Sequence, residues 1–150
     1  MPRRRPRLDG DPSKYGMEHR PGGDGPPLRD LLVGDLAPRD IYEHPEWYTG
    51  VDDQSSRDAI AAVMRYRGRP RAWIYRAGPT RELNPGDWVA LSRSYANTHR
   101  ASVDPTYKVC AFRVNTNDVR WAGDDLAEWG YFGAETKTIP ENCSRGRRAR

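Results

Sequence analysis

The apolar residues of this chain occur in short runs that glycine and proline interrupt, and this spacing restricts the fold more than any other feature. The 150 residues include 14 glycines and 13 prolines. Only "SSRDAIAAVMRYRG" (55–68) has the apolar spacing of a clear helix. Ser55 lies three residues before Asp58, as in a capping box, and Gly68 is suited to end the helix. Pro70 then prevents the helix from continuing.

The other apolar runs have the composition of strands. Residues 71–78 ("RAWIYRAG") and 107–115 ("YKVCAFRVN") are rich in aromatic and branched residues. Another strand is predicted from about Trp88, with Ser92 and Ser94 at its end, and a further strand around 128–132. One helix followed by several short strands, without regular alternation, predicts an α+β domain with a mainly antiparallel sheet.

The basic residues are concentrated at the two ends of the chain, although the whole carries a formal charge of only +4. Residues 1–30 are net positive and rich in Pro and Gly, and "RGRRAR" (145–150) has four arginines and no acid. We therefore expect a flexible N-terminal segment (1–30), a folded domain (31–140) and a basic tail (141–150). Arginine-rich ends attract nucleic acid non-specifically by releasing counterions, or are simply solvated termini.

The cysteines and the apolar runs bear on the cellular compartment. No apolar run approaches the roughly 18 residues of a membrane span, and the N-terminal residues lack the apolar region of a signal peptide. Two cysteines do not make a disulfide framework, and no Cys/His spacing suggests zinc. Cys110 alternates with apolar neighbours, so we expect a buried, reduced thiol there. These features predict a soluble intracellular protein without an export signal.

Four polar residues lie where strands would normally place core residues. Arg76 follows "WIY", and Glu128 lies among aromatic residues. Ser92 and Ser94 share the parity of the preceding strand residues, which predicts that both hydroxyls lie on one face. Each residue alone is most often an exposed strand or strand-end residue. Their combined order along the chain is more informative.

The order Arg, Ser-x-Ser, Glu resembles the Arg-Ser-Glu signature of ADP-ribosyltransferases, which cleave NAD and transfer ADP-ribose to an acceptor. "GDWVALSRSYA" and "GDDLAEWGY" are similar to small ADP-ribosyltransferase-like domains of actinobacteriophages, which occur alone, attached to head-associated proteins, or within polyvalent proteins. The similarity covers roughly residues 38–133. It implies a mainly antiparallel split sheet with few helices, NAD as co-substrate without a metal, and a location in the host bacterial cytoplasm or the virion.

The resemblance also implies a role for each residue. Glu128 would stabilise the positive charge that develops on the ribose as nicotinamide leaves. Arg76 would hold the pyrophosphate, for which a guanidinium fork is well shaped. Ser92 would contact the ribose and orient Glu128, Ser94 would support the end of the strand, and Tyr95 would stack on nicotinamide.

Four further residues also bear on the chemistry that the resemblance implies. His99 would contact NAD or be a structural or exposed histidine. Asp124 and Asp125 would recognise the acceptor or form a capped turn. Leu126 occupies the position two residues before Glu128 at which arginine-modifying members have a second Glu. The usual acceptor-activating carboxylate is therefore missing, unless Asp124 or Asp125 replaces it. The acceptor would then be a host protein or a nucleic acid, or water.

The sequence therefore leaves three hypotheses. The first is a phage-encoded mono-ADP-ribosyltransferase that modifies a host or phage macromolecule. The second is a catalytically inactive phage or virion protein that keeps the fold and binds nucleic acid through its basic tails. The third is a small ribonuclease that uses His44 or His99 with Glu128. A cleft shared by Arg76, Ser92 and Glu128 would favour the first.

Overall fold

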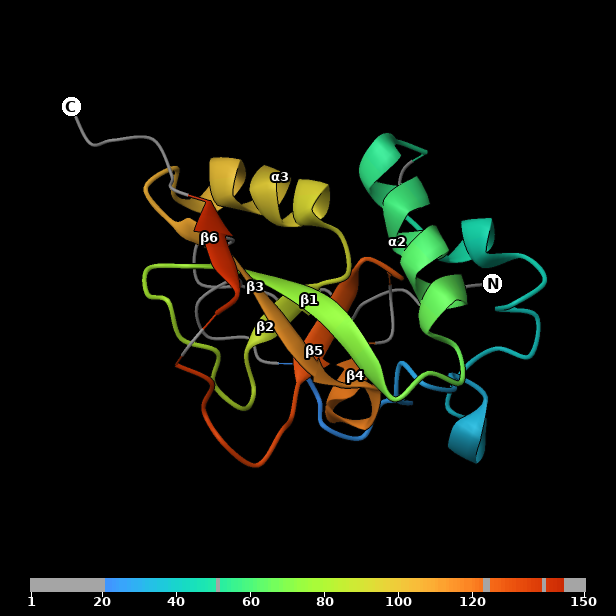
Figure 1. Cartoon of the computed structure of the whole chain (residues 1–150). Coiled ribbons are helices and arrows are strands. Elements are labelled where there is room, and N and C mark those ends of the chain that lie inside the picture. The colour runs from blue at the N-terminus through green and yellow to red at the C-terminus, as the bar shows by residue number, and fades with distance from the viewer. Residues whose placement is uncertain (1–20, 51, 123–124, 139, 145–150) are drawn as a thin grey trace, which may run out of the picture.

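The computed structural model describes residues 21–50, 52–122, 125–138 and 140–144. Within these residues, two α-helices accompany a single six-stranded sheet, so the predicted α+β class is confirmed (Figure 1). The strands lie in the order β4-β5-β2-β1-β3-β6, and every neighbouring pair is antiparallel. The elements are α2 (Gln54–Tyr66), α3 (Arg93–Val103), β1 (Arg71–Gly78), β2 (Trp88–Ala90), β3 (Lys108–Asn115), β4 (Val119–Trp121), β5 (Glu128–Tyr131) and β6 (Asn142–Ser144), with short 3-10 helices η1 (Val33–Asp35), η2 (Pro45–Tyr48) and η3 (Thr116–Asp118).

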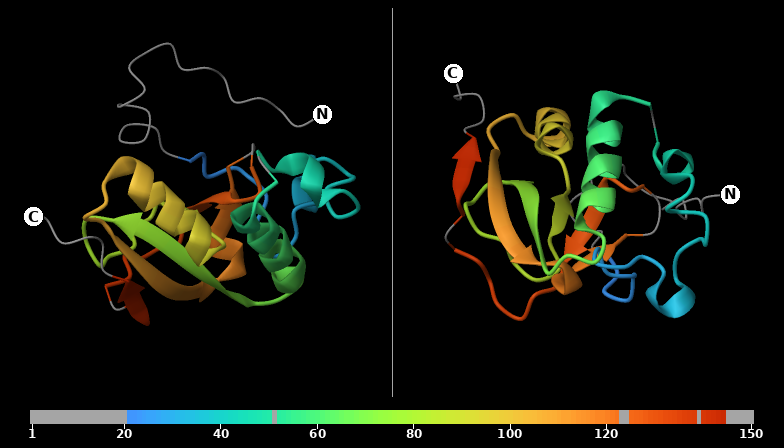
Figure 2. Two further views of the ribbon diagram at one scale, coloured as in Figure 1. Left: turned by 90° about the horizontal axis from the view of Figure 1, so that it is seen from above. Right: turned by 45° about the vertical axis from the view of Figure 1, so that its right-hand side comes forward.

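The two faces of the sheet pack against different partners. Along β1, Ile74 contributes to the main core, whereas Tyr75 packs with a smaller cluster beneath α3. Helix α3 crosses the sheet on this second face, and α2 lies beside it (Figures 1 and 2). Because strand side chains alternate between faces, the parity of a residue on β1, β2, β3 or β5 determines whether it lies on the α3 face or on the core face.

Helix α2 confirms the predicted helix but not its predicted cap. The residue before the helix is Asp53, whose side chain accepts a hydrogen bond from the backbone N–H of Ser56 at 2.8 Å. Ser55 lies inside the helix, so its prediction as the capping residue was wrong. Asp and Ser are nearly equal as N-caps, so local preference alone does not choose between them. The predicted end is confirmed, because Gly68 adopts a φ of 73°, a left-handed conformation that suits glycine.

Helix α3 replaces the second half of a predicted strand. Strand β2 ends at Ala90, and Ser92 is the N-cap of α3, with its Oγ accepting a hydrogen bond from Tyr95 N–H at 2.9 Å. The prediction that Ser92 and Ser94 share one face of a strand was therefore wrong. The helix was missed because Ala96 is its only buried residue among those described, so the sequence shows little helical periodicity.

The remaining predicted strands are confirmed, with β1 matching residues 71–78 and β3 and β5 starting or ending within one residue of the prediction. Part of the segment expected to be a flexible lead-in also packs on the domain. Leu28 is fully buried and its N–H donates to the carbonyl of Val119, while Trp121 N–H donates to the carbonyl of Pro26. This segment covers the outer edge of β4. Residues 1–20 and 145–150 lie outside the described residues.

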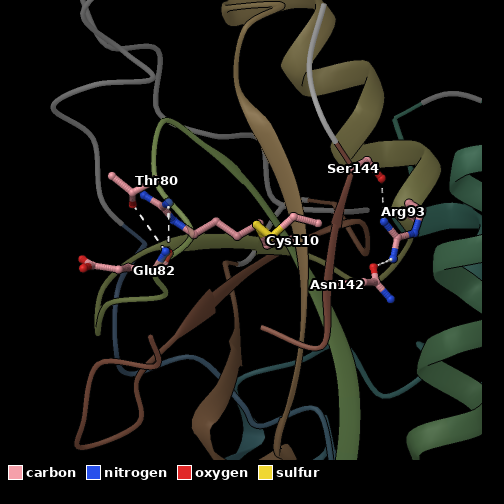
Figure 3. The surroundings of a disulfide bond; sticks show 8 residues. Thr80, Glu82, Arg93, Cys110, Asn142 and Ser144 are labelled. Carbon is pink, nitrogen blue, oxygen red and sulfur yellow. Dashed lines mark hydrogen bonds between the residues drawn. A yellow bond between two sulfur atoms is a disulfide. The ribbon is translucent and has the colours of Figure 1, made fainter. Parts of the chain in front are cut away.

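Cys110 and Cys143 form a disulfide, so the prediction of a reduced thiol was wrong (Figure 3). Cys110 is buried, as expected. The two residues are 33 positions apart and become direct partners because β6 pairs with β3. That pairing is a long-range contact which the local sequence does not indicate. In the described part of the chain, no helix has both the length and the apolar character needed to cross a membrane.

Candidate functional site

Glu128 lies on the α3 face of the sheet. It is the first residue of β5 and pairs with Ala90 of β2, which in turn pairs with Tyr75 of β1. All three therefore point towards α3. Glu128 is half-buried, and its Oε1 accepts a hydrogen bond from the hydroxyl of Tyr95 at 2.9 Å. The first turn of α3 thus holds one oxygen of the carboxylate in place.

The two serines lie at the beginning of α3 and form a hydrogen-bonded chain with Asp58. The Oγ atoms of Ser92 and Ser94 are 3.1 Å apart, and Ser94 donates to Oδ2 of Asp58 at 3.1 Å. A carboxylate accepts only, so Ser94 uses its single proton on Asp58, and Ser92 must donate its own proton to Ser94. The chain therefore runs from Ser92 through Ser94 to Asp58.

Asp58 is a member of this site that the sequence interpretation used only as part of a helix cap. It lies on α2, where Gln54 donates to its Oδ1 at 2.8 Å. Both carboxylate oxygens are thus engaged, one by each helix. No local signal pointed to this role, because Asp58 and Ser94 are 36 residues apart in the sequence.

Tyr95 joins the serine pair to the carboxylate. Its backbone N–H donates a hydrogen bond to Oγ of Ser92, and its hydroxyl donates a hydrogen bond to Oε1 of Glu128. Its ring packs with Ala90, Ala96 and Val109 beneath α3. The predicted stacking of Tyr95 on nicotinamide stays a prediction, and the structure adds the contact with Glu128.

Arg76 lies on the opposite face of the sheet from Glu128. It pairs with Cys110, and its neighbours in β1, Tyr75 and Ala77, point towards α3. Its Nε is 2.7 Å from Oδ2 of Asp87, and both side chains are largely buried, at 17% and 12% exposed. A guanidinium at such a site needs a carboxylate partner, and Asp87 supplies it.

A second contact restrains the same guanidinium. Nη1 of Arg76 donates to the carbonyl of Glu82 at 3.2 Å. The guanidinium also lies over Gly78, where an added Cβ would come within 2.2 Å of Nη1. The structure therefore brings Ser92, Ser94, Tyr95 and Glu128 together, and it places Arg76 apart from them.

His99 lies on α3, one turn after Tyr95, and is exposed. Partial burial of its imidazole lowers the pKa of the ring below the ordinary value. His44 lies in the segment before α2, where its ring stacks on Trp47 with centroids 4.0 Å apart and its Nδ1 is 3.3 Å from Glu46.

The loop before β5 is organised by Asp125. Its Oδ2 accepts from the N–H of Gly50 at 2.9 Å, and its Oδ1 accepts from the N–H of Ala127 at 2.8 Å. Asp125 therefore forms the capped turn that was one of its two predicted roles. Asp124 lies outside the described residues. Leu126 is fully buried, so the position two residues before Glu128 belongs to the core.

Within the described residues, no group of three or more His, Cys, Asp or Glu side chains is arranged to hold a metal ion. No protein-family model, curated protein or solved structure matches this chain. Any function must therefore be argued from the chemistry of the site itself.

Proposed function

We propose that this protein is an NAD-dependent ADP-ribosyltransferase whose central carboxylate is Glu128. The observation that carries the proposal is the contact between Tyr95 and Glu128, which holds a half-buried carboxylate against the first turn of α3, the helix that Ser92 caps. The strand-to-helix segment that contains the serines and the strand that contains the glutamate are distant in sequence. They meet on one face of the sheet, as the resemblance to ADP-ribosyltransferases requires for the serine and the glutamate, whereas Arg76 lies on the other face.

The chemistry uses the carboxylate as an electrostatic stabiliser. Cleavage of the bond between nicotinamide and ribose develops positive charge on the ribose and releases neutral nicotinamide. A carboxylate at the ribose 2′-hydroxyl stabilises that charge more in the transition state than in the bound substrate. In the proposal, Tyr95 orients Glu128 through Oε1, and Ser92 fixes the start of the helix that carries Tyr95.

Arg76 has a different role in this proposal from the one the resemblance implies. Its ion pair with Asp87 anchors the turn that leads into β2, and Asp87 also accepts from the N–H of Asn84 at 2.7 Å. Strand β2 leads directly to Ser92. Arg76 is therefore a positioning residue on the core face of the sheet, and it does not hold the pyrophosphate.

The acceptor in the proposal is a host or phage macromolecule. The residue two positions before Glu128 is the buried Leu126, which has no group to activate a nucleophile. Both carboxylate oxygens of Asp125 already accept backbone hydrogen bonds, one from Ala127 in its own turn and the other from Gly50. An acceptor must therefore bring its own nucleophile into position, or water must take its place.

The test is release of nicotinamide from NAD by the purified full chain, alone and with a bacterial lysate. We expect Glu128→Gln to fold, to bind NAD and to lose turnover by about 100-fold or more. Glu135→Gln is the matched control, because Glu135 is an exposed carboxylate in the segment after β5. Turnover retained in a folded Glu128→Gln protein would contradict the proposal. Absence of release by the wild-type protein, with no thermal stabilisation by NAD, would also contradict it.

A further inference from the structure

Helix α2 ends and β1 begins at one corner of the molecule (Figure 1). Six exposed arginines lie in or beside this part of the chain. Four of them alternate along "RYRGRPR", and two come from elsewhere in the chain. We call this set the arginine corner. Its members are Arg29, Arg65, Arg67, Arg69, Arg71 and Arg113.

Backbone contacts bring the two distant members to the corner. The N–H of Gly68 donates to the carbonyl of Arg29 at 2.8 Å, so Arg29 lies beside the loop after α2. Strand pairing aligns Arg71 with Asn115 and Trp73 with Arg113. Arg71 and Arg113 are therefore diagonal neighbours on one face of the β1–β3 pair.

The corner holds little negative charge to balance these arginines. Residues 64–73 contain no Asp or Glu, although residues 31–144 as a whole have more acidic than basic side chains. The neighbouring Asp30 is half-buried and accepts from Leu32 N–H and from the Tyr42 hydroxyl. Between described residues, the ion pairs found do not involve any member of the corner.

Helix stabilisation explains only part of the set. Basic residues near a helix C-terminus interact favourably with the helix dipole, which accounts for Arg65 and Arg67. The effect falls off within the last turn, so it does not explain Arg69, Arg71 or Arg113. The side chains of these three residues are exposed, and helix stabilisation does not account for their charge.

Aromatic rings hold two of the guanidinium groups. The guanidinium carbon of Arg67 lies 3.8 Å from the centroid of the Tyr42 ring, and that of Arg65 lies 5.9 Å from the Tyr66 ring. Stacking of this kind leaves the N–H groups at the edge of the guanidinium available to bind a phosphate in a bidentate manner. It also reduces the conformational entropy that is lost on binding.

We propose that the arginine corner binds the sugar-phosphate backbone of a nucleic acid without regard to base sequence. Phosphate contacts from arginine supply most non-specific affinity for nucleic acid. An acidic protein is a poorer match, because the cores of protein interfaces are depleted in charge and the corner consists of charged side chains around Gly68 and Pro70. The site is separate from Glu128 and does not depend on NAD cleavage.

The test measures binding of the full chain to a fluorescently labelled 20-base-pair duplex of mixed sequence over a range of salt concentrations. The variant Arg69→Gln, Arg71→Gln, Arg113→Gln removes three charges and leaves Arg67 on Tyr42. We expect the slope of log K against log salt to fall by up to about 2.7, at roughly 0.9 for each lost phosphate contact. Affinity should fall equally for unrelated sequences.

Two control variants separate the corner from the rest of the chain. The first is Arg57→Gln, Arg81→Gln, Lys137→Gln, which removes the same charge from exposed residues elsewhere and should reduce the slope by less than the corner variant does. The second replaces the arginines of the C-terminal tail: Arg145→Gln, Arg147→Gln, Arg148→Gln and Arg150→Gln. Binding that survives the second set and weakens in the corner variant supports the proposal.

Two outcomes would overturn it. One is a corner variant that binds with the affinity and salt slope of the wild-type protein. The other is displacement of the duplex by polyglutamate as effectively, charge for charge, as by unlabelled DNA, which would indicate a general anion-binding surface. Neither readout involves NAD, so a failure of the proposed enzymatic function would leave this test unaffected.

Discussion

The hydroxyl of Tyr95 donates a hydrogen bond to Oε1 of Glu128 over 2.9 Å, although the two residues are 33 positions apart. The contact joins the first turn of α3 to the start of β5. Both side chains are half-buried, so the carboxylate is oriented by the protein. The Tyr95 hydroxyl therefore contributes to the stability of the fold and also orients the carboxylate that the proposed chemistry uses.

Removing the Tyr95 hydroxyl should disturb the orientation of the Glu128 carboxylate more than it disturbs the binding of NAD. We expect Tyr95→Phe to lower kcat for nicotinamide release by roughly 10- to 100-fold, with a smaller change in KM, because a mispositioned carboxylate stabilises the transition state poorly. The free energy of unfolding should fall by about 1–3 kcal/mol, as for a hydrogen bond to a charged group. Tyr107→Phe serves as the control, and equal kcat values for the two variants would refute a role for Tyr95.

The chain from Ser92 through Ser94 to Asp58 should behave as one coupled unit. We expect Ser94→Ala and Asp58→Ala each to destabilise the fold by about 1 kcal/mol, because each leaves a half-buried polar group without its partner. In a double-mutant cycle followed by urea unfolding, the two changes should be non-additive by at least about 0.5 kcal/mol. Strict additivity would show that the hydrogen bond between Ser94 and Asp58 does not contribute to the free energy of unfolding.

The ion pair of Arg76 and Asp87 should contribute to stability and not to NAD affinity. We expect Arg76→Ala and Asp87→Ala each to destabilise the protein by about 3 kcal/mol, since each leaves a largely buried charge uncompensated. The double variant should lose less than the sum of the two. Arg76→Lys supplies the control, because it keeps the charge without the guanidinium fork. A selective loss of NAD binding by folded Arg76→Lys would instead assign Arg76 to the pyrophosphate.

The disulfide should stabilise the attachment of β6. For residues 33 apart, the loop-closure model gives about 3.7 kcal/mol of stability that a reducing agent removes. Arg93 also holds β6, by donating to Oδ1 of Asn142 at 2.6 Å and to Oγ of Ser144 at 2.9 Å (Figure 3).

The measurement is thermal unfolding with and without dithiothreitol, beside the double variant Cys110→Ala, Cys143→Ser. The variant should melt at the temperature of the reduced wild-type protein and should not respond to the reductant. A wild-type protein that melts at the same temperature in both conditions would contradict a stabilising disulfide.

Tyr48 should make stability depend on pH in the alkaline range. Burial and the hydrogen bond with Asp40 raise the pKa of Tyr48 to about 12, against 10.0 for an ordinary tyrosine. The folded state therefore favours the neutral phenol. Its contribution is complete below pH 10 and is lost as the pH rises from 10 towards 12, because the unfolded chain ionises first.

The comparison is with Tyr48→Phe, in which this ionisation is absent. We expect the variant to be less stable than the wild-type protein at pH 7, because Asp40 loses its partner. The difference in the free energy of unfolding, measured by urea at several pH values, should shrink above pH 10. A constant difference up to pH 12 would contradict the raised pKa.

The local sequence was sufficient to predict those elements whose residues have a strong preference for one kind of secondary structure. Strands β1 and β3 are rich in branched and aromatic residues, which pack well on a pleated surface, and both were predicted to within one residue. The end of α2 was predicted because Gly68 readily adopts a positive φ. The α+β class followed from these short elements.

Tertiary structure decided what the polar residues do. Ser92 is equally compatible with the end of a strand and the start of a helix. Packing of Ala96, on α3, against Ala90 and Val109 of the sheet selected the helix. The pairing of Cys110 with Cys143 and the contact of Ser94 with Asp58 join residues more than 30 positions apart. Arg76 was directed to Asp87 by its parity on β1. Such contacts depend on which strands become neighbours, and no local stretch of the sequence contains that information.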